Sequence, residues 1–133
     1  MIVDDCVDIA KRMIGGDYTD HTKSLGCVIN GELVAATTYD HFNGVSMQFG
    51  IWAGSRPSPE WSQAIFAYPF DQLGVQKLIG IIFSSNAKSI KLAEHSGFEL
   101  EAVVKDAHPE GDMLVYTMTR DQCRVLNKWR VAA

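Results

Sequence analysis

Two polar residues on one predicted helix have the types and the spacing that could take part in chemistry. The stretch 86–98 reads NAKSIKLAEHSGF. At 100° per residue, Asn86 and Ser89 fall on the same face as Leu92, so an amide and a hydroxyl share the apolar side of this helix. A buried polar group costs about 1–3 kcal/mol unless it finds a hydrogen-bond partner. Asn86 and Ser89 therefore need either local partners or a bound ligand.

The residues alone leave both explanations of this pair open. In the first, Asn86 is an ordinary helix N-cap residue and Ser89, in the first turn, bonds a nearby backbone group. In the second, the two side chains face a ligand that lies along the helix. Gly97 and Phe98 fit a structural role in either case, as a left-handed helix stop and a core residue that opens the next strand.

The pattern as a whole resembles a known family. The spacing Asn-x-x-Ser-x-x-x-x-Glu-x-x-Gly-Phe, which runs from Asn86 through Glu94 to Phe98, resembles the fourth-helix motif of the Gcn5-related N-acetyltransferases (GNAT). The ribosomal-protein-acetyltransferase-like branch is the most similar. The resemblance extends from about residue 45 to about residue 120 and includes the Gly-Asp-x-x-x-Tyr sequence at 111–116. Similar endings occur in small acetyltransferase-like proteins of bacteria and their phages.

This resemblance implies an α/β (α+β) fold of the acyl-CoA N-acyltransferase type. Such a fold has a mixed central sheet with antiparallel N-terminal strands, a parallel pair that splays at the cofactor site, and flanking helices. It also implies acetyl-CoA as a substrate and a catalytic pair in which Asn86 contacts the pantetheine arm and Ser89 lies near the thioester sulfur. Other branches use a tyrosine to protonate the leaving thiolate, and Ala93 stands at that position here. The implied site is therefore of a serine type.

The sequence departs from the family in the loop expected to hold the cofactor phosphates. The usual glycine-rich signature is replaced by GSRPSP at 54–59, in which Pro57 and Pro59 offer no backbone N–H. The guanidinium of Arg56 could compensate, or Arg56 could be a surface residue of a capped turn. The resemblance implies a cofactor-binding set of Phe49, Ile51, Trp52, Ala53, Ser55, Arg56, Ser58, Asn86 and Ser89.

Apolar periodicity and turn signals predict the elements that position these residues. Asn30-Gly31 is a strong hairpin signal, Asn43-Gly44 predicts a second turn, and Ser58 followed by proline predicts a helix start. Pro69 lies inside that helix and predicts a kink or an early change of direction. The expected elements are helix 4–14, strands 26–29, 33–39 and 45–53, helix 58–73, a parallel strand 77–83, helix 86–96, strands 98–104 and 113–118 joined by a polar loop at 108–112, and a short helical tail within 120–133.

Composition limits the classes of partner and cofactor. The 133 residues, 47% of them hydrophobic, predict a single domain over 1–133. A net charge of −4 without a dense basic stripe argues against nucleic acid as a partner. Cys6, Cys27 and Cys123 lack zinc-ligand spacing, so we expect free thiols in a reducing cytoplasm and no metal. No run of roughly 18 apolar residues predicts a membrane span.

Two functional hypotheses follow. The first is an acetyl-CoA-dependent N-acetyltransferase that acts on an amine of an unknown protein or small molecule. The alternative is a catalytically inactive GNAT-fold module that binds a protein, such as a phage-type effector of a host enzyme. The N-terminal part is shorter than in the family, so a neighbouring subunit of a homodimer could complete the acceptor pocket. Asp40 and His41 are interpreted as turn residues, and the sequence identifies no general base.

Overall fold

The computed structural model describes residues 1–4 and 21–128, and this part of the chain forms a seven-stranded mixed sheet. The strand order is β1-β2-β3-β4-β5-β7-β6, and every neighbouring pair is antiparallel except β4 with β5. The mixed sheet with one parallel pair confirms the predicted fold class. The strands are β1 (Ile2–Asp4), β2 (Lys23–Ile29), β3 (Glu32–Asp40), β4 (Ser46–Ala53), β5 (Lys77–Phe83), β6 (Glu99–His108) and β7 (Gly111–Met118).

The N-terminal half of the sheet is a meander whose turns follow the predicted signals. Asn30 and Gly31 both have positive φ, 53° and 78°, as a two-residue hairpin turn with a right-handed twist requires. Gly44 in the second turn has φ 89°. The helix predicted over 4–14 falls almost wholly on residues outside those described, and Ile2–Asp4 instead forms β1, which the sequence did not predict.

The first crossover helix, α2 (Pro59–Ala67), begins as predicted. The Ser58 hydroxyl accepts a hydrogen bond from the backbone N–H of Trp61 at 3.2 Å, which caps the helix. The chain then changes to π-helical geometry in η1 (Tyr68–Gln72), which contains Pro69. In an α-helix the N–H of residue 69 would bond the carbonyl of Ile65, and proline has no N–H to give. The hydroxyl of Tyr39 donates to that carbonyl instead, at 2.6 Å.

The second half follows the predicted order with one correction. Helix α3 (Ala87–Ser96) ends at Gly97, whose φ of 114° is left-handed as expected. A Cβ at Gly97 would overlap the backbone of Gln122, so the segment after β7 packs directly on this glycine. The polar loop predicted at 108–112 was wrong in extent, because His108 pairs with Gly111 and the connection shrinks to a two-residue turn. The tail forms η2 (Arg120–Gln122) and α4 (Arg124–Lys128).

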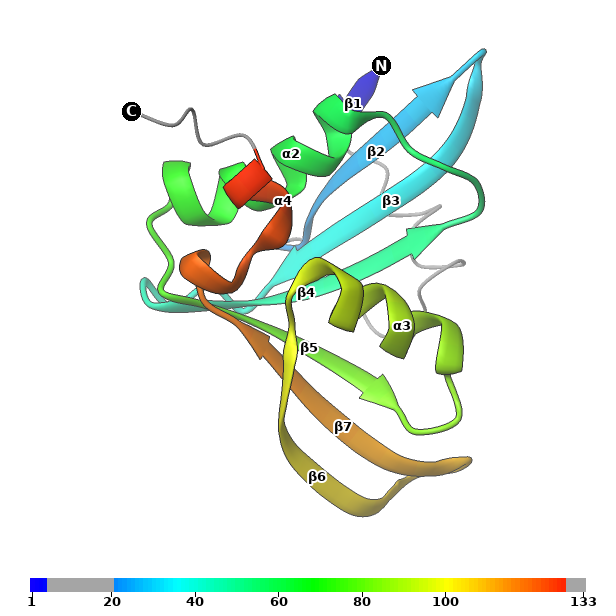
Figure 1. Ribbon diagram of the computed structural model, residues 1–133, viewed down its shortest axis with the longest axis vertical. Coiled ribbons are helices and arrows are strands. Elements are labelled where there is room, and N and C mark those ends of the chain that lie inside the picture. The colour runs from blue at the N-terminus through cyan, green and yellow to red at the C-terminus, as the bar shows by residue number, and fades with distance from the viewer. Residues whose placement is uncertain (5–20, 129–133) are drawn as a thin grey trace.

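The described helices all lie on one face of the sheet (Figure 1). Between them and the sheet lies an aromatic cluster in which the Phe49 ring stacks on Phe66 at 5.3 Å and tilts against Phe98 at 5.7 Å. Cys27 and Cys123 are buried free thiols, as predicted. No helix among the described residues is long and apolar enough to cross a membrane. The core therefore holds the two elements that carry the predicted site, since Phe49 of β4 and Ala93 of α3 belong to the same hydrophobic cluster.

Candidate active site

The predicted splay lies between β4 and β5. These strands pair in parallel only where Ser46–Gln48 meets Lys77–Ile79. Beyond that point β4 stays paired with β3 as far as Ala53, and β5 stays paired with β7 as far as Phe83, so the two strands diverge (Figure 1). The facing edges of both strands are consequently free of sheet pairing over residues 49–53 and 80–83.

The backbone of β4 presents hydrogen-bonding groups to this gap. The carbonyl of Phe49 faces β5, since a Cβ on Gly80 would lie 3.6 Å from it. The next carbonyl, that of Gly50, turns the other way and accepts a hydrogen bond from the Thr37 hydroxyl of β3 at 2.6 Å. In an antiparallel strand the backbone groups alternate in this manner, so the N–H and C=O of Ile51 and Ala53 point into the gap.

The gap opens into a cavity of about 710 Å³. Helix α3 lies across the gap on one face of the sheet (Figure 1). On β5, Leu78 belongs to the core beneath the helices, so strict alternation places Ile79, Ile81 and Phe83 on the opposite face, and these residues also line the cavity. The cavity therefore passes between the strands and reaches both faces. Six of the predicted site residues line it: Phe49, Ile51, Trp52, Ala53, Asn86 and Ser89.

The two polar residues of α3 behave differently in the structure. The amide oxygen of Asn86 accepts a hydrogen bond from the backbone N–H of Ser89 at 3.2 Å, so Asn86 caps the helix as the first explanation predicts. The hydroxyl of Ser89 makes no hydrogen bond within the part of the chain that the structure describes, so the local bond expected for it is missing. Both side chains are half-buried and line the cavity. The Ser89 hydroxyl can thus engage a ligand without breaking a contact, and so can the side-chain N–H groups of Asn86.

The loop after β4 does not form a phosphate cradle of the usual kind. The backbone N–H groups of Gly54 and Ser55 both donate to the carbonyl of Val34, at 2.8 and 3.4 Å. Ser58 is engaged in capping α2, and the Arg56 side chain is exposed. The predicted cofactor residues Ser55, Arg56 and Ser58 lie outside the cavity lining, and their part in binding stays a prediction.

The structure adds cavity residues that sequence reasoning missed. Asp40 and His41, interpreted as turn residues, line the cavity, although His41 does have the positive φ of a turn (56°). The Asp40 carboxylate accepts a hydrogen bond from the Thr22 hydroxyl at 2.6 Å. Lys88 of α3 reaches back over the gap and donates to the carbonyl of Ala53 at 3.2 Å. Its long flexible stem allows a position that helix periodicity does not predict.

Two aromatic residues complete the described walls. The His108 ring stacks on Phe83 with centroids 4.3 Å apart and planes at 8°, and its Nδ1 accepts from the backbone N–H of Glu110. The Tyr116 hydroxyl donates to Glu94 of α3 at 3.0 Å, and burial, followed by this hydrogen bond, raises the pKa of Tyr116. No group of three metal-ligating side chains occurs among residues 1–4 and 21–128. The cavity therefore offers acid–base and hydrogen-bonding groups.

Comparisons with known proteins agree with this geometry at the level of the fold. No protein-family model matches the sequence, and no curated protein does. The N-acetyltransferase PseH of Campylobacter jejuni, solved in complex with acetyl coenzyme A, superposes with a TM-score of 0.61 at 19% identity over 77% of this chain and 70% of that chain.

Two further solved structures are similar. Mutant forms of the spermidine/spermine N-acetyltransferase SpeG of Vibrio cholerae give a TM-score of 0.66 at 15% identity, covering 85% of this chain and 74% of that one. A GNAT-family acetyltransferase of Bacillus anthracis gives 0.62 at 17% identity, covering 75% and 66%. The ribosomal-protein-acetyltransferase-like branch stays a prediction. This chain has the fold of the GNAT N-acetyltransferases.

Proposed function

We propose that the protein transfers an acetyl group from acetyl-CoA to a primary amine of a protein or small molecule. The observation that carries this proposal is the cavity at the β4–β5 splay, which brings the free backbone of β4 and the Ser89 hydroxyl to one space. The fold supports it, since the similar PseH was solved with acetyl coenzyme A. A fold alone does not decide function, and it is the retained site that favours an enzyme.

The free edge of β4 is suited to the pantetheine arm. That arm carries two amide groups, and the N–H and C=O of Ile51 and Ala53 can bond it as they would a neighbouring strand. Apolar side chains, including Ile82 and Leu92, line the cavity. An arm held in this way directs the thioester along α3 toward Ser89.

The reaction needs no group beyond the amine, the thioester and proton carriers. The nitrogen lone pair of a neutral amine attacks the acetyl carbonyl carbon, the C–S bond breaks, and an amide and a thiolate form. The nitrogen loses one proton and the thiolate gains one, so the transfer is balanced for a neutral amine. The Ser89 hydroxyl donates to the leaving sulfur, and the backbone N–H of Ile51 stabilises the oxyanion.

The acceptor amine enters from the face opposite α3. Asp40 and His41 lie at the C-terminal end of β3 and line the cavity together with Gln48, whose strand position is paired with Asp40. A carboxylate at this entrance attracts an ammonium group, and the amine must lose a proton before it attacks because its reference pKa is about 10.4. We assign proton removal to this end of the cavity, with His41 as the acceptor.

Binding and turnover of acetyl-CoA test the proposal. A ligand at 100 times its Kd raises the free energy of unfolding by about 2.7 kcal/mol, so acetyl-CoA should raise the melting temperature in a concentration-dependent manner. Release of free CoA thiol in the presence of a panel of polyamines and lysine peptides then measures transfer. Ser89→Ala should keep the binding and lose most of the turnover. No thermal shift at millimolar acetyl-CoA refutes the enzyme and leaves the inactive binding module as the hypothesis.

A further inference from the structure

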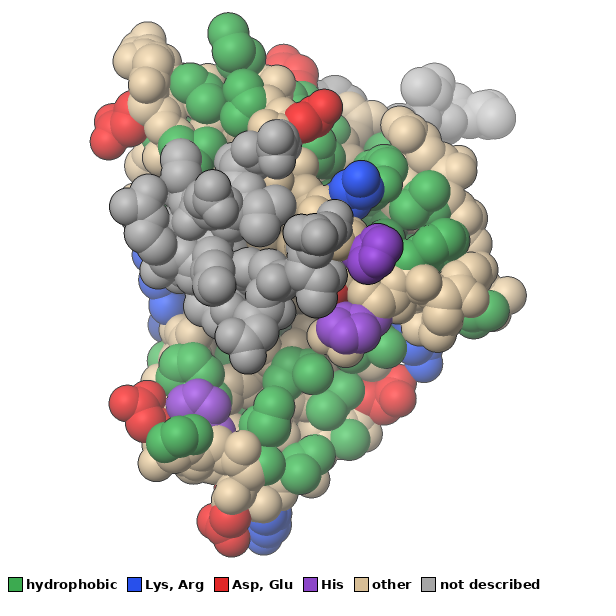
Figure 2. Space-filling model, turned by 180° about the vertical axis from the view of Figure 1, so that it is seen from behind, with side chains coloured by type: hydrophobic (Ala, Val, Ile, Leu, Met, Phe, Trp, Pro, Cys, Tyr) green, Lys and Arg blue, Asp and Glu red, His purple; other side chains and the backbone are tan. Residues whose placement is uncertain are grey.

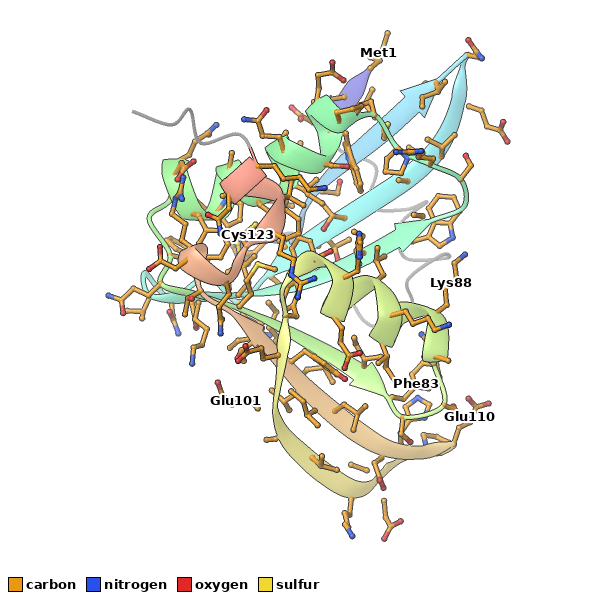
Figure 3. All side chains as sticks on the ribbon, viewed as in Figure 1. Met1, Phe83, Lys88, Glu101, Glu110 and Cys123 are labelled. Atoms are coloured by element: carbon orange, nitrogen blue, oxygen red, sulfur yellow. The ribbon has the colours of Figure 1, made fainter. Side chains whose placement is uncertain are left out.

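We infer that Lys88 binds the diphosphate of the cofactor and replaces the glycine-rich loop that this chain lacks. The inference rests on the proposed function, because it concerns the same cavity. Lys88 is the second residue after the N-cap Asn86 of α3, and its Nζ donates to the carbonyl of Ala53, the last residue of β4, at 3.2 Å. The ammonium therefore spans the gap where β4 ends. Figure 3 labels Lys88 near the N-terminal end of α3.

The Lys88 ammonium forms no ion pair with a carboxylate of the described residues. Among the described residues that line the cavity, it is the one lysine or arginine. An ammonium in the first turn of a helix opposes the helix dipole, whose positive end lies there, so the position favours an added anion. An ammonium has three N–H donors, and Ala53 takes one of them. Two donors remain for a ligand at the mouth of the cavity.

The neighbouring loop has few backbone N–H groups to offer a phosphate. The N–H groups of Gly54 and Ser55 already donate to Val34 of β3. Pro57 and Pro59 have no N–H. A diphosphate that follows an arm bonded to Ile51 and Ala53 leaves the gap beside Ala53, where Lys88 Nζ is held. Lysine acts on phosphate as a compact point charge, which needs no pre-shaped loop.

Two thioesters that differ in the diphosphate separate this role from a structural one. Acetyl-CoA carries the diphosphate and, beyond it, adenosine 3′-phosphate, whereas S-acetylpantetheine has the same arm and thioester without either. Calorimetry for acetyl-CoA and NMR titration for S-acetylpantetheine give both Kd values for the wild type, Lys88→Ala, Lys88→Arg and Lys91→Ala. Lys91 is the matched control, since it is an exposed lysine on the same helix that does not line the cavity.

Lys88→Ala should raise the Kd of acetyl-CoA by about 10- to 100-fold, the range of a hydrogen bond to a charged group, and leave that of S-acetylpantetheine within about twofold. Lys88→Arg should recover most of the affinity, and Lys91→Ala should lose little. An equal loss of affinity for both thioesters would show that Lys88 only ties α3 to β4. No loss of affinity for either would show that Lys88 does not contact the cofactor. Either result overturns the inference. A wild-type chain that binds neither thioester overturns the proposed function itself, before any variant is measured.

Discussion

The hydrogen bond from Tyr39 to Ile65 offers a prediction that can be worked out from the structure. The Tyr39 hydroxyl donates at 2.6 Å to the carbonyl that Pro69, having no N–H, leaves without its helical partner. Tyr39 is 1% exposed. Tyr39→Phe keeps the ring and its edge contact with Tyr68, so it removes the donor and leaves a buried carbonyl unpaired. The expected cost is about 1–3 kcal/mol of the free energy of unfolding.

This cost should depend on Pro69. In Pro69→Ala the chain regains an N–H that can bond the Ile65 carbonyl, so Tyr39→Phe in that background should cost less, with a coupling free energy of about 1 kcal/mol or more. Pro69 is buried, so its loss also removes packing, but that loss is common to both proteins that carry Pro69→Ala and cancels in the double-mutant cycle.

Urea unfolding followed by far-UV circular dichroism measures all four proteins, and melting temperatures check the order. For a chain of this length, each kcal/mol corresponds to about 3–5 °C. Equal costs of Tyr39→Phe in the wild-type and Pro69→Ala backgrounds would refute the reasoning, since the hydroxyl would then stabilise the fold by something other than the orphaned carbonyl.

Three further predictions concern other described residues. Burial and, next, the neighbouring phenol raise the pKa of Tyr39 far above its ordinary 10.0, so the folded chain keeps a proton that the unfolded chain loses above pH 10. The free energy of unfolding, measured relative to Tyr39→Phe, should therefore keep its full value below pH 10 and fall above it by about 1.4 kcal/mol per pH unit. Urea unfolding at pH 9–11 measures this difference. Gly97→Ala should lower the free energy of unfolding by about 3 kcal/mol or more, because the added Cβ meets the backbone of Gln122. Gly74 also has positive φ but no atom near an added Cβ, so Gly74→Ala should cost only the backbone strain of about 1–2 kcal/mol. Similar melting temperatures for the two variants would contradict the packing argument. Asn86→Ser should keep the helix cap and the melting temperature, while Asn86→Ala should lose about 1 kcal/mol; if the serine variant also keeps full affinity for acetyl-CoA, the amide contacts no cofactor.

The features that local sequence determines were predicted well. The hairpin at Asn30-Gly31, the cap at Ser58 and the left-handed stop at Gly97 each depend on a backbone conformation that one or two residues dictate. The motif at 86–98 then indicated the fold, and the fold implied the splay between β4 and β5 that the structure shows. Local signals were therefore enough to place the elements that carry the site.

The site residues that the sequence did not predict are those that only the pairing of distant strands brings together. Asp40 faces the cavity because β3 and β4 pair so that Asp40 lies opposite Gln48, and β4 then diverges from β5 at that level. A turn-like sequence around His41 gives no sign of this. Figure 2 shows the face away from the described helices, where hydrophobic side chains gather beside histidines.

The role proposed for Lys88 changes how Pro57 and Pro59 of the loop are interpreted. From sequence, Pro57 and Pro59 count against cofactor binding because they remove donors from the expected phosphate site. In the structure, that loop is fastened to β3 through the Val34 carbonyl, and α2 begins at Pro59, where a proline costs no helical hydrogen bond. The prolines therefore stiffen the loop that follows β4, and in the proposed site the positive charge comes from Lys88 of α3. A chain organised in this way should bind acetyl-CoA with a stronger dependence on salt than one that relies on neutral N–H groups, and Lys88→Ala should remove that excess dependence.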